Sequence, residues 1–138
     1  MTQLSEIMNR TLITVDTHAS LRQAQRILDR HNIRHLFVMD GKRLVGIVTD
    51  RDLRKAAPSS KSPLTTSERE EFMDELKVVE VMLRKLITAS SSTTVREAAK
   101  VMVREKIGCL PVVDGKTLVG IVTETDLLEI LVRGEGTS

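Results

Sequence analysis

Two short stretches of the chain carry a hydroxyl and a carboxylate at the same spacing, Thr49-Asp50-Arg51-Asp52 and Thr123-Glu124-Thr125-Asp126. Each follows an apolar run and precedes residues at helical spacing, so each lies where a strand enters a helix. The first N–H groups of a helix lack partners within it and form a natural phosphate site. There, Thr49 adds a hydroxyl donor and Arg51 a cation for a phosphate, while Asp52 offers two acceptor oxygens suited to a ribose diol.

The same spacing also has a purely structural interpretation. Thr-x-x-Asp at a helix start is a capping box, in which the Thr hydroxyl accepts the Asp N–H and the Asp carboxylate accepts the Thr N–H. The four residues alone favour capping, both at Thr49 and Asp52 and at Thr123 and Asp126. The two roles can coexist if each carboxylate oxygen takes one of them.

Both stretches belong to a long internal repeat. Residues 7–56 align with residues 81–130 without a gap, and about 22 of the 50 positions are identical. A copy of about fifty residues buries too little apolar surface to be stable alone. We therefore expect one structural unit that occurs twice, with each copy covering the other.

Hydrophobic periodicity predicts the same elements in both copies. The first copy has a strand at 12–15, a helix at 21–30, hairpin strands at 36–39 and 44–48, and a closing helix at 50–55. The second has them at 86–89, 95–106, 110–113, 118–122 and 124–131. The turns Asp40-Gly41 and Asp114-Gly115 call for a positive φ at glycine. The expected fold class is α+β, with two strand-helix-strand-strand-helix repeats packed by pseudo-twofold symmetry.

The repeats divide the chain into repeat 1 at 1–56, a spacer at 57–77, repeat 2 at 78–132 and a disordered tail at 133–138. In the spacer, Thr66 or Ser67 is expected to cap a helix at 68–76. Phe72, Met73 and Leu76 give this helix a small apolar face. We favour an ordered spacer packed on the module, and a docking surface for a partner is the alternative.

Composition narrows the function classes. The net charge is +2, basic and acidic residues are interspersed, and the chain has two Phe and no Tyr or Trp, so we expect no nucleic-acid partner. A single cysteine, Cys109, excludes an intrachain disulfide and fits a reducing compartment. The sequence shows no signal peptide and no membrane span, and we expect a cytoplasmic protein. His18, His31 and His35 do not cluster, so we expect no metal site.

The doubled pattern, in which Gly-Ile-Val-Thr-x-x-Asp-Leu leads a strand into a helix after Ile-x-x-Leu-x-Val and a turn, resembles the CBS domain. Because both repeats carry it, the chain resembles a stand-alone pair of CBS domains, also called a Bateman module. The spacer is similar to that of small proteins of the acetoin-utilisation type. The resemblance implies a non-catalytic regulatory module that binds adenine nucleotides or S-adenosylmethionine in clefts between the repeats, and that forms a homodimer.

The resemblance also implies which residues line each cleft, because in this family both copies contribute. The Asp52 site would take Ile47, Thr49, Arg51, Arg34 and His35 from the first copy, and Ile87, Ile107, Gly108 and Cys109 from the second. The Asp126 site would take Ile121, Thr123, Thr125, Gly108 and Cys109 from the second copy, and Met8, Ile13, Ile33, Arg34 and His35 from the first. Aliphatic walls suit an adenine ring. The duplication and the family pattern together favour ligand binding over capping alone.

The copies differ at positions that bear on the ligand. Arg34-His35 corresponds to Gly108-Cys109, and Arg51 corresponds to Thr125. The Asp52 site thus has more cationic groups, and we expect it to bind the more highly phosphorylated ligand. Taken without the family placement, His35 and Cys109 are more simply explained as structural residues.

Three function classes follow from these observations. The leading hypothesis is a regulatory module that senses AMP, ADP, ATP or S-adenosylmethionine, for example as an energy sensor, and signals to an unknown effector protein by conformational or dimer rearrangement. The alternative is a constitutive dimerisation or interaction scaffold with empty clefts. An enzyme is disfavoured, because the sequence has no Ser/His/Asp constellation, no Walker-type loop and no paired carboxylates with an evident acid and base.

Overall fold

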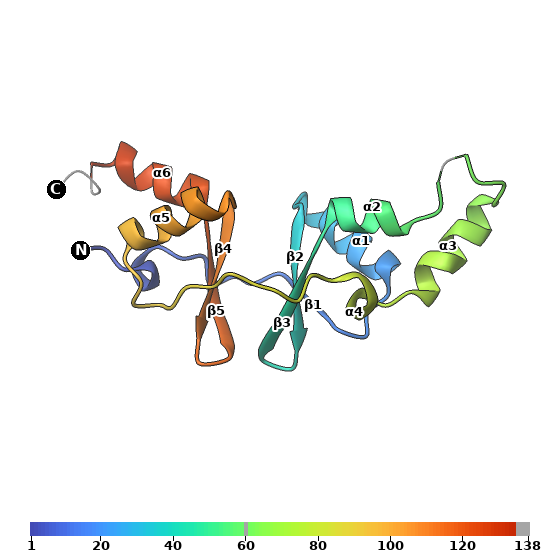
Figure 1. Cartoon of the computed structure of the whole chain (residues 1–138), viewed down its shortest axis with the longest axis horizontal. Helices are drawn as coiled ribbons and strands as arrows, with labels where there is room; N and C mark the ends of the chain where they lie inside the picture. Colours follow the sequence, from blue (N-terminus) through green and yellow to red (C-terminus); the bar gives the residue numbers. More distant parts are fainter. Residues whose placement is uncertain (60, 135–138) are drawn as a thin grey trace. The chain divides into compact units, whose positions relative to one another are not determined.

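The computed structural model describes residues 1–59 and 61–134 (Figure 1). The chain forms two compact units. The first, here called the continuous unit, is the single stretch Ile13–Leu86, and the second, the split unit, combines Met1–Leu12 with Ile87–Ser138. Both units mix helices with strands, which confirms the α+β class. The tail expected at 133–138 lies outside the described residues from residue 135 onward.

The continuous unit contains a sheet in which β1 pairs in parallel with β2, and β2 pairs antiparallel with β3. Gly41, at the turn between β2 and β3, has the predicted positive φ of 63°. The helices and strands, in chain order, are β1 (Thr14–Asp16), α1 (Leu21–His31), β2 (His35–Asp40), β3 (Arg43–Thr49), α2 (Asp50–Ala56), α3 (Thr66–Glu75) and α4 (Val78–Val81).

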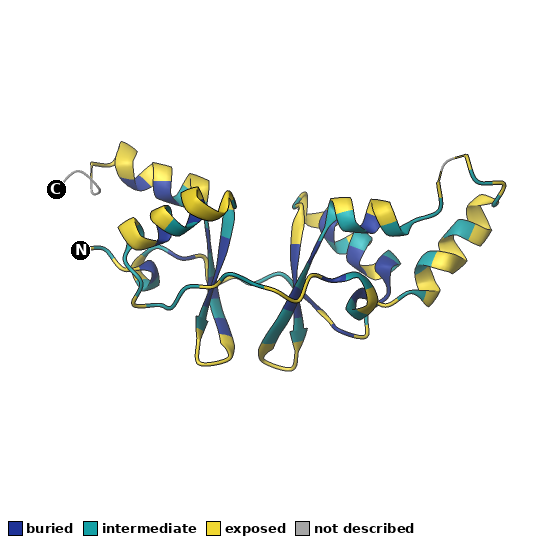
Figure 2. Ribbon diagram, viewed as in Figure 1, coloured by how far each residue is buried: buried dark blue, intermediate teal, exposed yellow. Residues whose placement is uncertain are grey.

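Helix α1 shows how the sequence builds this unit. Ser20 caps it with a complete capping box, since the Ser20 hydroxyl accepts the Gln23 N–H at 3.1 Å and the Gln23 side chain accepts the Ser20 N–H at 2.9 Å. Its apolar stripe of Leu21, Ala24 and Leu28 is buried. This stripe packs into one core with the inward side chains of β1, β2 and β3. Figure 2 shows buried residues along the strands of this unit and exposed residues at the tip of its hairpin.

The split unit repeats this plan with η1 (Leu4–Glu6), α5 (Val95–Glu105), β4 (Cys109–Asp114), β5 (Thr117–Thr123) and α6 (Glu124–Val132). Strands β4 and β5 pair antiparallel, and Gly115 at their turn has a φ of 64°. Thr94 caps α5 by accepting the Glu97 N–H at 3.2 Å. The core combines Ala98 and Met102 of α5 with inward residues of β4, β5, α6 and the N-terminal segment.

The prediction of a strand at residues 86–89 is wrong, because this segment makes only an isolated parallel bridge, between Ala89 and Val112. Its two hydrogen bonds run from the Ala89 N–H to the Pro111 carbonyl at 3.0 Å and from the Val113 N–H to the Ala89 carbonyl at 2.7 Å. Pro111 stands where the first copy has Phe37 in β2. Because proline has no N–H, the ladder cannot extend by the next bond.

The N-terminal twelve residues belong with the second repeat. The Asn9 N–H donates to the Ile121 carbonyl at 2.9 Å and the Ile121 N–H returns a bond of 3.0 Å, while the Leu4 N–H donates to the Thr93 carbonyl at 2.8 Å. The continuous unit has the equivalent pair between Ile47 and Leu83, at 3.0 and 2.8 Å. Each β-hairpin therefore pairs with the segment that begins the other repeat in the sequence.

The spacer helix α3 lies in the continuous unit. It begins after Thr65, whose hydroxyl accepts the Glu68 N–H at 3.1 Å, so the expected caps Thr66 and Ser67 are wrong by one or two residues. Met73 and Leu76 pack against the core as expected, whereas Phe72 is exposed. Arg22 of α1 forms ion pairs with Glu70 and Asp74 of α3, which holds the helix against α1.

Candidate functional site

The junction between β3 and α2 contains a complete capping box. The Thr49 hydroxyl accepts the Asp52 N–H at 3.1 Å, and Asp52 Oδ2 accepts the Thr49 N–H at 3.0 Å. The first helical N–H, that of Asp50, donates to the Arg34 carbonyl at 3.0 Å. Since two of the first three N–H groups of α2 already have acceptors, this helix start offers fewer donors to a phosphate than the sequence suggested.

The junction between β5 and α6 has the same arrangement. The Thr123 hydroxyl accepts the Asp126 N–H at 3.3 Å, and Asp126 Oδ2 accepts the Thr123 N–H at 2.8 Å. The Glu124 N–H donates to the Gly108 carbonyl at 3.0 Å. The repeat is therefore preserved at the level of single hydrogen bonds.

Capping uses only part of each motif. In both motifs the Thr N–H donates to Oδ2 of the Asp, and within the described part of the chain neither Asp52 Oδ1 nor Asp126 Oδ1 accepts a hydrogen bond. Thr49 and Thr123 accept through their hydroxyl oxygens, so their hydroxyl protons can still be donated. Each junction thus combines a carboxylate oxygen with a hydroxyl donor, a pair that can bind neighbouring hydroxyl groups.

Register places further predicted residues beside each motif. His35 lies opposite Thr49 on the neighbouring strand, directly after exposed Arg34. Cys109 lies opposite Thr123 in the same way. Burial, and secondly the charge of Asp126, raise the pKa of the Cys109 thiol to about 11. Cys109 is thus a protonated, partly buried side chain next to the Asp126 motif.

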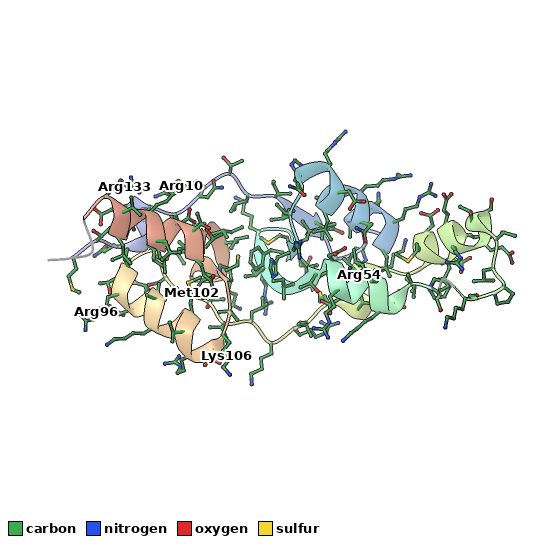
Figure 3. The ribbon with its side chains drawn as sticks, turned by 90° about the horizontal axis from the view of Figure 1, so that it is seen from above. Arg10, Arg54, Arg96, Met102, Lys106 and Arg133 are labelled. Carbon is green, nitrogen blue, oxygen red and sulfur yellow. The ribbon has the colours of Figure 1, made fainter. Side chains whose placement is uncertain are left out.

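The two junctions differ in charge. The one in the continuous unit has Arg34 and Arg51 near its motif, and its Asp50 carboxylate pairs with Arg54 at 3.5 Å. Figure 3 labels Arg54 on α2. The junction in the split unit has Gly108 and Thr125 at the positions of Arg34 and Arg51, and its Glu124 corresponds to Asp50.

The predicted aliphatic residues divide between the units. Ile13 and Ile33 pack at the core of the continuous unit, where half-buried Ile47 also lies in β3. Ile87 and Ile107 pack at the core of the split unit, where half-buried Ile121 lies in β5. Met8 is buried in the same core, in the unit that contains Asp126. A cleft that draws residues from both repeats stays a prediction.

The split unit contains a cavity that the sequence analysis did not predict. It has a volume of about 400 Å³, and its lining residues are Thr2, Glu6, Ile7, Asp126, Glu129 and Arg133. Asp126 and Glu129 lie one turn apart on α6 and Arg133 follows one turn later at its C-cap, a spacing that was visible in the sequence. The contribution of residues 2–7 was not, because no local pattern assigns them to the second repeat. Figure 3 labels Arg133 at the end of α6.

Metal binding and membrane spanning are two further roles that the geometry can test. Within residues 1–59 and 61–134, no group of three or more His, Cys, Asp or Glu side chains is placed to hold a metal ion. No helix in these stretches is long and apolar enough to cross a membrane.

Comparison with known proteins identifies both repeats. The sequence profile described as the CBS domain matches residues 4–59 and again residues 78–133. A CBS domain-containing protein of Dictyostelium discoideum is 36% identical over 132 residues, which cover 94% of this chain and 91% of the relative. An L-aspartate semialdehyde sulfurtransferase of Methanocaldococcus jannaschii is 35% identical over 130 residues, but the match spans only 23% of that enzyme.

Solved structures show the same fold. An acetoin utilization protein (AcuB) from Vibrio cholerae has a TM-score of 0.79 and 31% identity, with 96% of this chain and 92% of that chain covered. A CBS domain pair in complex with 5′-methylthioadenosine and S-adenosyl-L-methionine has a TM-score of 0.75 and 32% identity, with 97% and 98% covered. With two matched repeats and relatives aligned over nearly their whole length, the chain belongs to the CBS domain family.

Proposed function

We propose that this chain is a regulatory module that binds an adenosine-containing ligand at its Thr-x-x-Asp junctions. The observation that carries the proposal is that the two oxygens of each carboxylate have different roles. Asp52 and Asp126 cap their helices through Oδ2, and each Oδ1 has no hydrogen-bond partner in the described part of the chain. A free carboxylate oxygen beside a hydroxyl donor suits the 2′- and 3′-hydroxyl groups of a ribose.

The similar CBS pair in complex with 5′-methylthioadenosine and S-adenosyl-L-methionine supports this ligand class. The two ligands share an adenosine and differ in the substituent on its 5′ carbon. AMP, ADP and ATP share the same adenosine, so the junction residues alone accept the whole set. The charged neighbours then select among them.

We expect the junction in the continuous unit to prefer phosphorylated ligands. Arg34 and Arg51 provide positive charge to a phosphate there, His35 offers a ring N–H donor, and fork-shaped guanidinium groups bind phosphate oxygens in pairs. The junction in the split unit has no cation at these three positions. Its carboxylates Glu124 and Asp126 match Asp50 and Asp52 but are not balanced by arginine, so it suits an uncharged or cationic 5′ substituent.

Regulation requires that the ligand bind one conformation of the module better than another. A ligand shifts a conformational equilibrium only by its differential affinity for the two states. In this proposal the bound state presents a different surface, or a different dimer, to an effector protein. The chain itself performs no catalysis.

A second candidate function is a constitutive scaffold whose junctions only cap helices. The completeness of both capping boxes favours it, because every atom needed for capping is in place without a ligand. Exposed Leu128, Leu131 and Val132 of α6 also offer an apolar surface for self-association.

Thermal unfolding separates the two candidates. The chain has no Tyr or Trp, so the transition is followed by circular dichroism, with AMP, ADP, ATP, 5′-methylthioadenosine or S-adenosylmethionine at millimolar concentration. A ligand at 100 times its Kd adds about 2.7 kcal/mol, which raises the Tm by several degrees. A scaffold shows no shift with any of them.

Asp52→Asn and Asp126→Asn make the test specific. Asparagine keeps one oxygen to accept the Thr N–H, but replaces the other oxygen with an amide donor. We expect each variant to retain its unliganded Tm and to lose the ligand-induced shift at its own junction. Asp40→Asn, the same change at an exposed hairpin turn, is the matched control. Retention of the full shift in the Asp52→Asn/Asp126→Asn double variant would refute the proposed site.

A further inference from the structure

The cavity of the split unit begins at the Asp126 junction and continues along helix α6. Its volume of about 400 Å³ lies within the range of small-molecule sites. Asp126 lines it from the first turn of the helix, Glu129 follows about 4.5 Å further along the helix axis, and Arg133 follows at about 10 Å. A ligand held by the Asp126 carboxylate therefore has this cavity beside it.

The other lining residues come from the N-terminal segment and are Thr2, Glu6 and Ile7. Glu6 Oε2 accepts the Gln3 N–H at 2.6 Å, whereas Glu6 Oε1 has no hydrogen-bond partner in the described part of the chain. Thr2 adds a hydroxyl group and Ile7 an apolar side chain. The N-terminal segment thus supplies a carboxylate oxygen that no other group of the unit uses.

The charged groups of the cavity are only partly neutralised within the chain. It is lined by one guanidinium, that of Arg133, and by three carboxylates, those of Glu6, Asp126 and Glu129. Arg133 Nε donates to the Glu129 main-chain carbonyl at 3.4 Å. Within residues 1–59 and 61–134, neither the Arg133 Nη groups nor the Glu129 carboxylate takes part in a hydrogen bond or ion pair. A ligand that matches these groups carries both signs of charge, with positive charge in excess.

The internal repeat shows that this negative charge is particular to the second copy. Glu129 corresponds to Lys55 in the alignment of the two copies, so the charge one turn after the motif is reversed. Lys55 follows Asp52 in α2, at the junction that we expect to bind phosphate. The reversal accompanies the replacement of Arg51 by Thr125. The helices that follow the two motifs thus differ in the sign of their charge.

We propose that the cavity binds the 5′ substituent of the ligand, and that this substituent is an α-amino-acid chain, as in S-adenosylmethionine. The inference rests on the proposed function, because Asp126 must hold the ribose for the chain to enter the cavity. The α-ammonium group then pairs with the carboxylates of Glu129 and Glu6. The α-carboxylate binds the guanidinium of Arg133, which offers donors in pairs. The positively charged sulfonium is attracted to the Asp126 carboxylate.

Other adenosine ligands match the cavity less well. AMP, ADP and ATP place their phosphates beside carboxylates, which repel them. 5′-Methylthioadenosine has a short, uncharged substituent that leaves Glu129 and Arg133 without ligand contacts. S-adenosylhomocysteine keeps the α-amino-acid chain and lacks only the positive charge on sulfur. The expected order of affinity at this junction is S-adenosylmethionine, S-adenosylhomocysteine, 5′-methylthioadenosine and then the nucleotides.

Calorimetric titration of the full chain tests the order. The Asp52→Asn background isolates the Asp126 junction, because it removes the ligand-binding oxygen of the other one. We expect S-adenosylmethionine and S-adenosylhomocysteine to bind at least tenfold more tightly than 5′-methylthioadenosine. Glu129→Gln and Arg133→Gln should each weaken the first two ligands about tenfold, since each removes a hydrogen bond between charged groups. The affinity for 5′-methylthioadenosine should change less than twofold.

Matched substitutions outside the cavity serve as controls. Glu105→Gln and Arg96→Gln change exposed residues of α5 that do not line the cavity, and they should leave all three affinities unchanged. Glu129→Lys introduces the charge that the first copy has at this position. It should weaken S-adenosylmethionine binding and strengthen ADP binding in the same background. Glu129 and Arg133 are exposed, and a circular-dichroism melt checks that each variant is folded.

The outcomes distinguish this inference from the proposed function. If 5′-methylthioadenosine binds as tightly as S-adenosylmethionine, or if the Glu129 and Arg133 variants weaken all three ligands equally, the cavity does not hold the 5′ chain and only this inference is wrong. If the parent binds adenosine ligands but the Asp52→Asn variant binds none, the inference is wrong and the proposed function holds only in the continuous unit. If the parent binds none of them either, both are wrong.

Discussion

Met8 packs directly over Gly120, and a Cβ added to this glycine would lie 2.5 Å from Met8 Sδ and 2.7 Å from Met8 Cγ. The equivalent residues of the other unit, Met82 and Gly46, repeat the relationship at 2.5 and 2.9 Å. Each methionine comes from the segment that begins one repeat and each glycine from the hairpin of the other. The Gly-Ile-Val-Thr motif therefore needs its glycine for close packing against this methionine.

Alanine at either glycine should destabilise the protein. We expect Gly46→Ala and Gly120→Ala to lower the free energy of unfolding by about 1–3 kcal/mol, the usual cost of overpacking. Gly46→Ala should be the more harmful, because its Cβ would also lie 3.0 Å from the Leu83 carbonyl oxygen, which is fixed by the bond to Ile47. Urea denaturation measures both. Gly108→Ala is the control, since its Cβ would meet Glu124 only at 3.5 Å and should cost little.

Loss of the helix caps should reduce stability without a ligand. Thr49→Ala and Thr123→Ala each remove the hydroxyl that accepts the Asp N–H, and we expect each to cost about 0.5–2 kcal/mol. Thr49→Ser and Thr123→Ser keep that oxygen and should stay close to the parent. Equal losses for the Ser and Ala variants in chemical denaturation would contradict the capping role.

Cys109 should react slowly with thiol reagents at neutral pH. With a pKa of about 11, only about one thiol in a thousand is ionised at pH 8, and the thiolate is the reactive form. The rate of modification by an aromatic disulfide should rise with pH up to about 11. Asp126→Asn removes one cause of the shift and should lower the apparent pKa. A full rate already at pH 8 would show that the thiol is not protected.

The Cys109 thiol also makes the free energy of unfolding depend on pH in the alkaline range. The unfolded chain releases the Cys109 proton near the ordinary thiol pKa of 9.0, whereas the folded chain retains it up to about 11. The native state therefore binds more protons over this interval, and the stability contributed by Cys109 decreases as pH rises from 9 to 11. Cys109→Ser should flatten this part of the stability profile.

Exchanging one residue between junctions should exchange ligand preference. Arg51→Thr in the continuous unit should weaken binding of ADP and ATP more than binding of 5′-methylthioadenosine, because the guanidinium acts on phosphate. Thr125→Arg should strengthen binding of phosphorylated ligands in the split unit. Calorimetric titration measures both. Equal losses for charged and uncharged ligands in Arg51→Thr would assign Arg51 a structural role.

Local patterns predicted the local features of the fold. The Asp-Gly pairs gave the two hairpin turns with positive φ, and Thr-x-x-Asp gave two capping boxes. Helical periodicity placed α1 within one residue of its observed end. These features depend on hydrogen bonds and contacts between residues close in the sequence, so a short window contains the information.

The predictions that were wrong or missing concern features that depend on residues distant in the sequence. The strand at 86–89 was expected from its own apolar residues, but Pro111 in another element removes the donor it needs. The assignment of Met8 and Asn9 to the second repeat follows from contacts with Gly120 and Ile121, more than one hundred positions away. The cavity that joins Glu6 to Asp126 was missed for the same reason.

The split unit has a consequence for the order in which the protein can fold during synthesis. The continuous unit, Ile13–Leu86, leaves the ribosome as one stretch and can complete its core while the rest of the chain is still being made. The first twelve residues emerge earlier still, but their partners Thr93 and Ile121 are translated long afterwards. This early segment is thus among the last parts of the two units to find its place, and until then its apolar Leu4 and Met8 have no native core to enter.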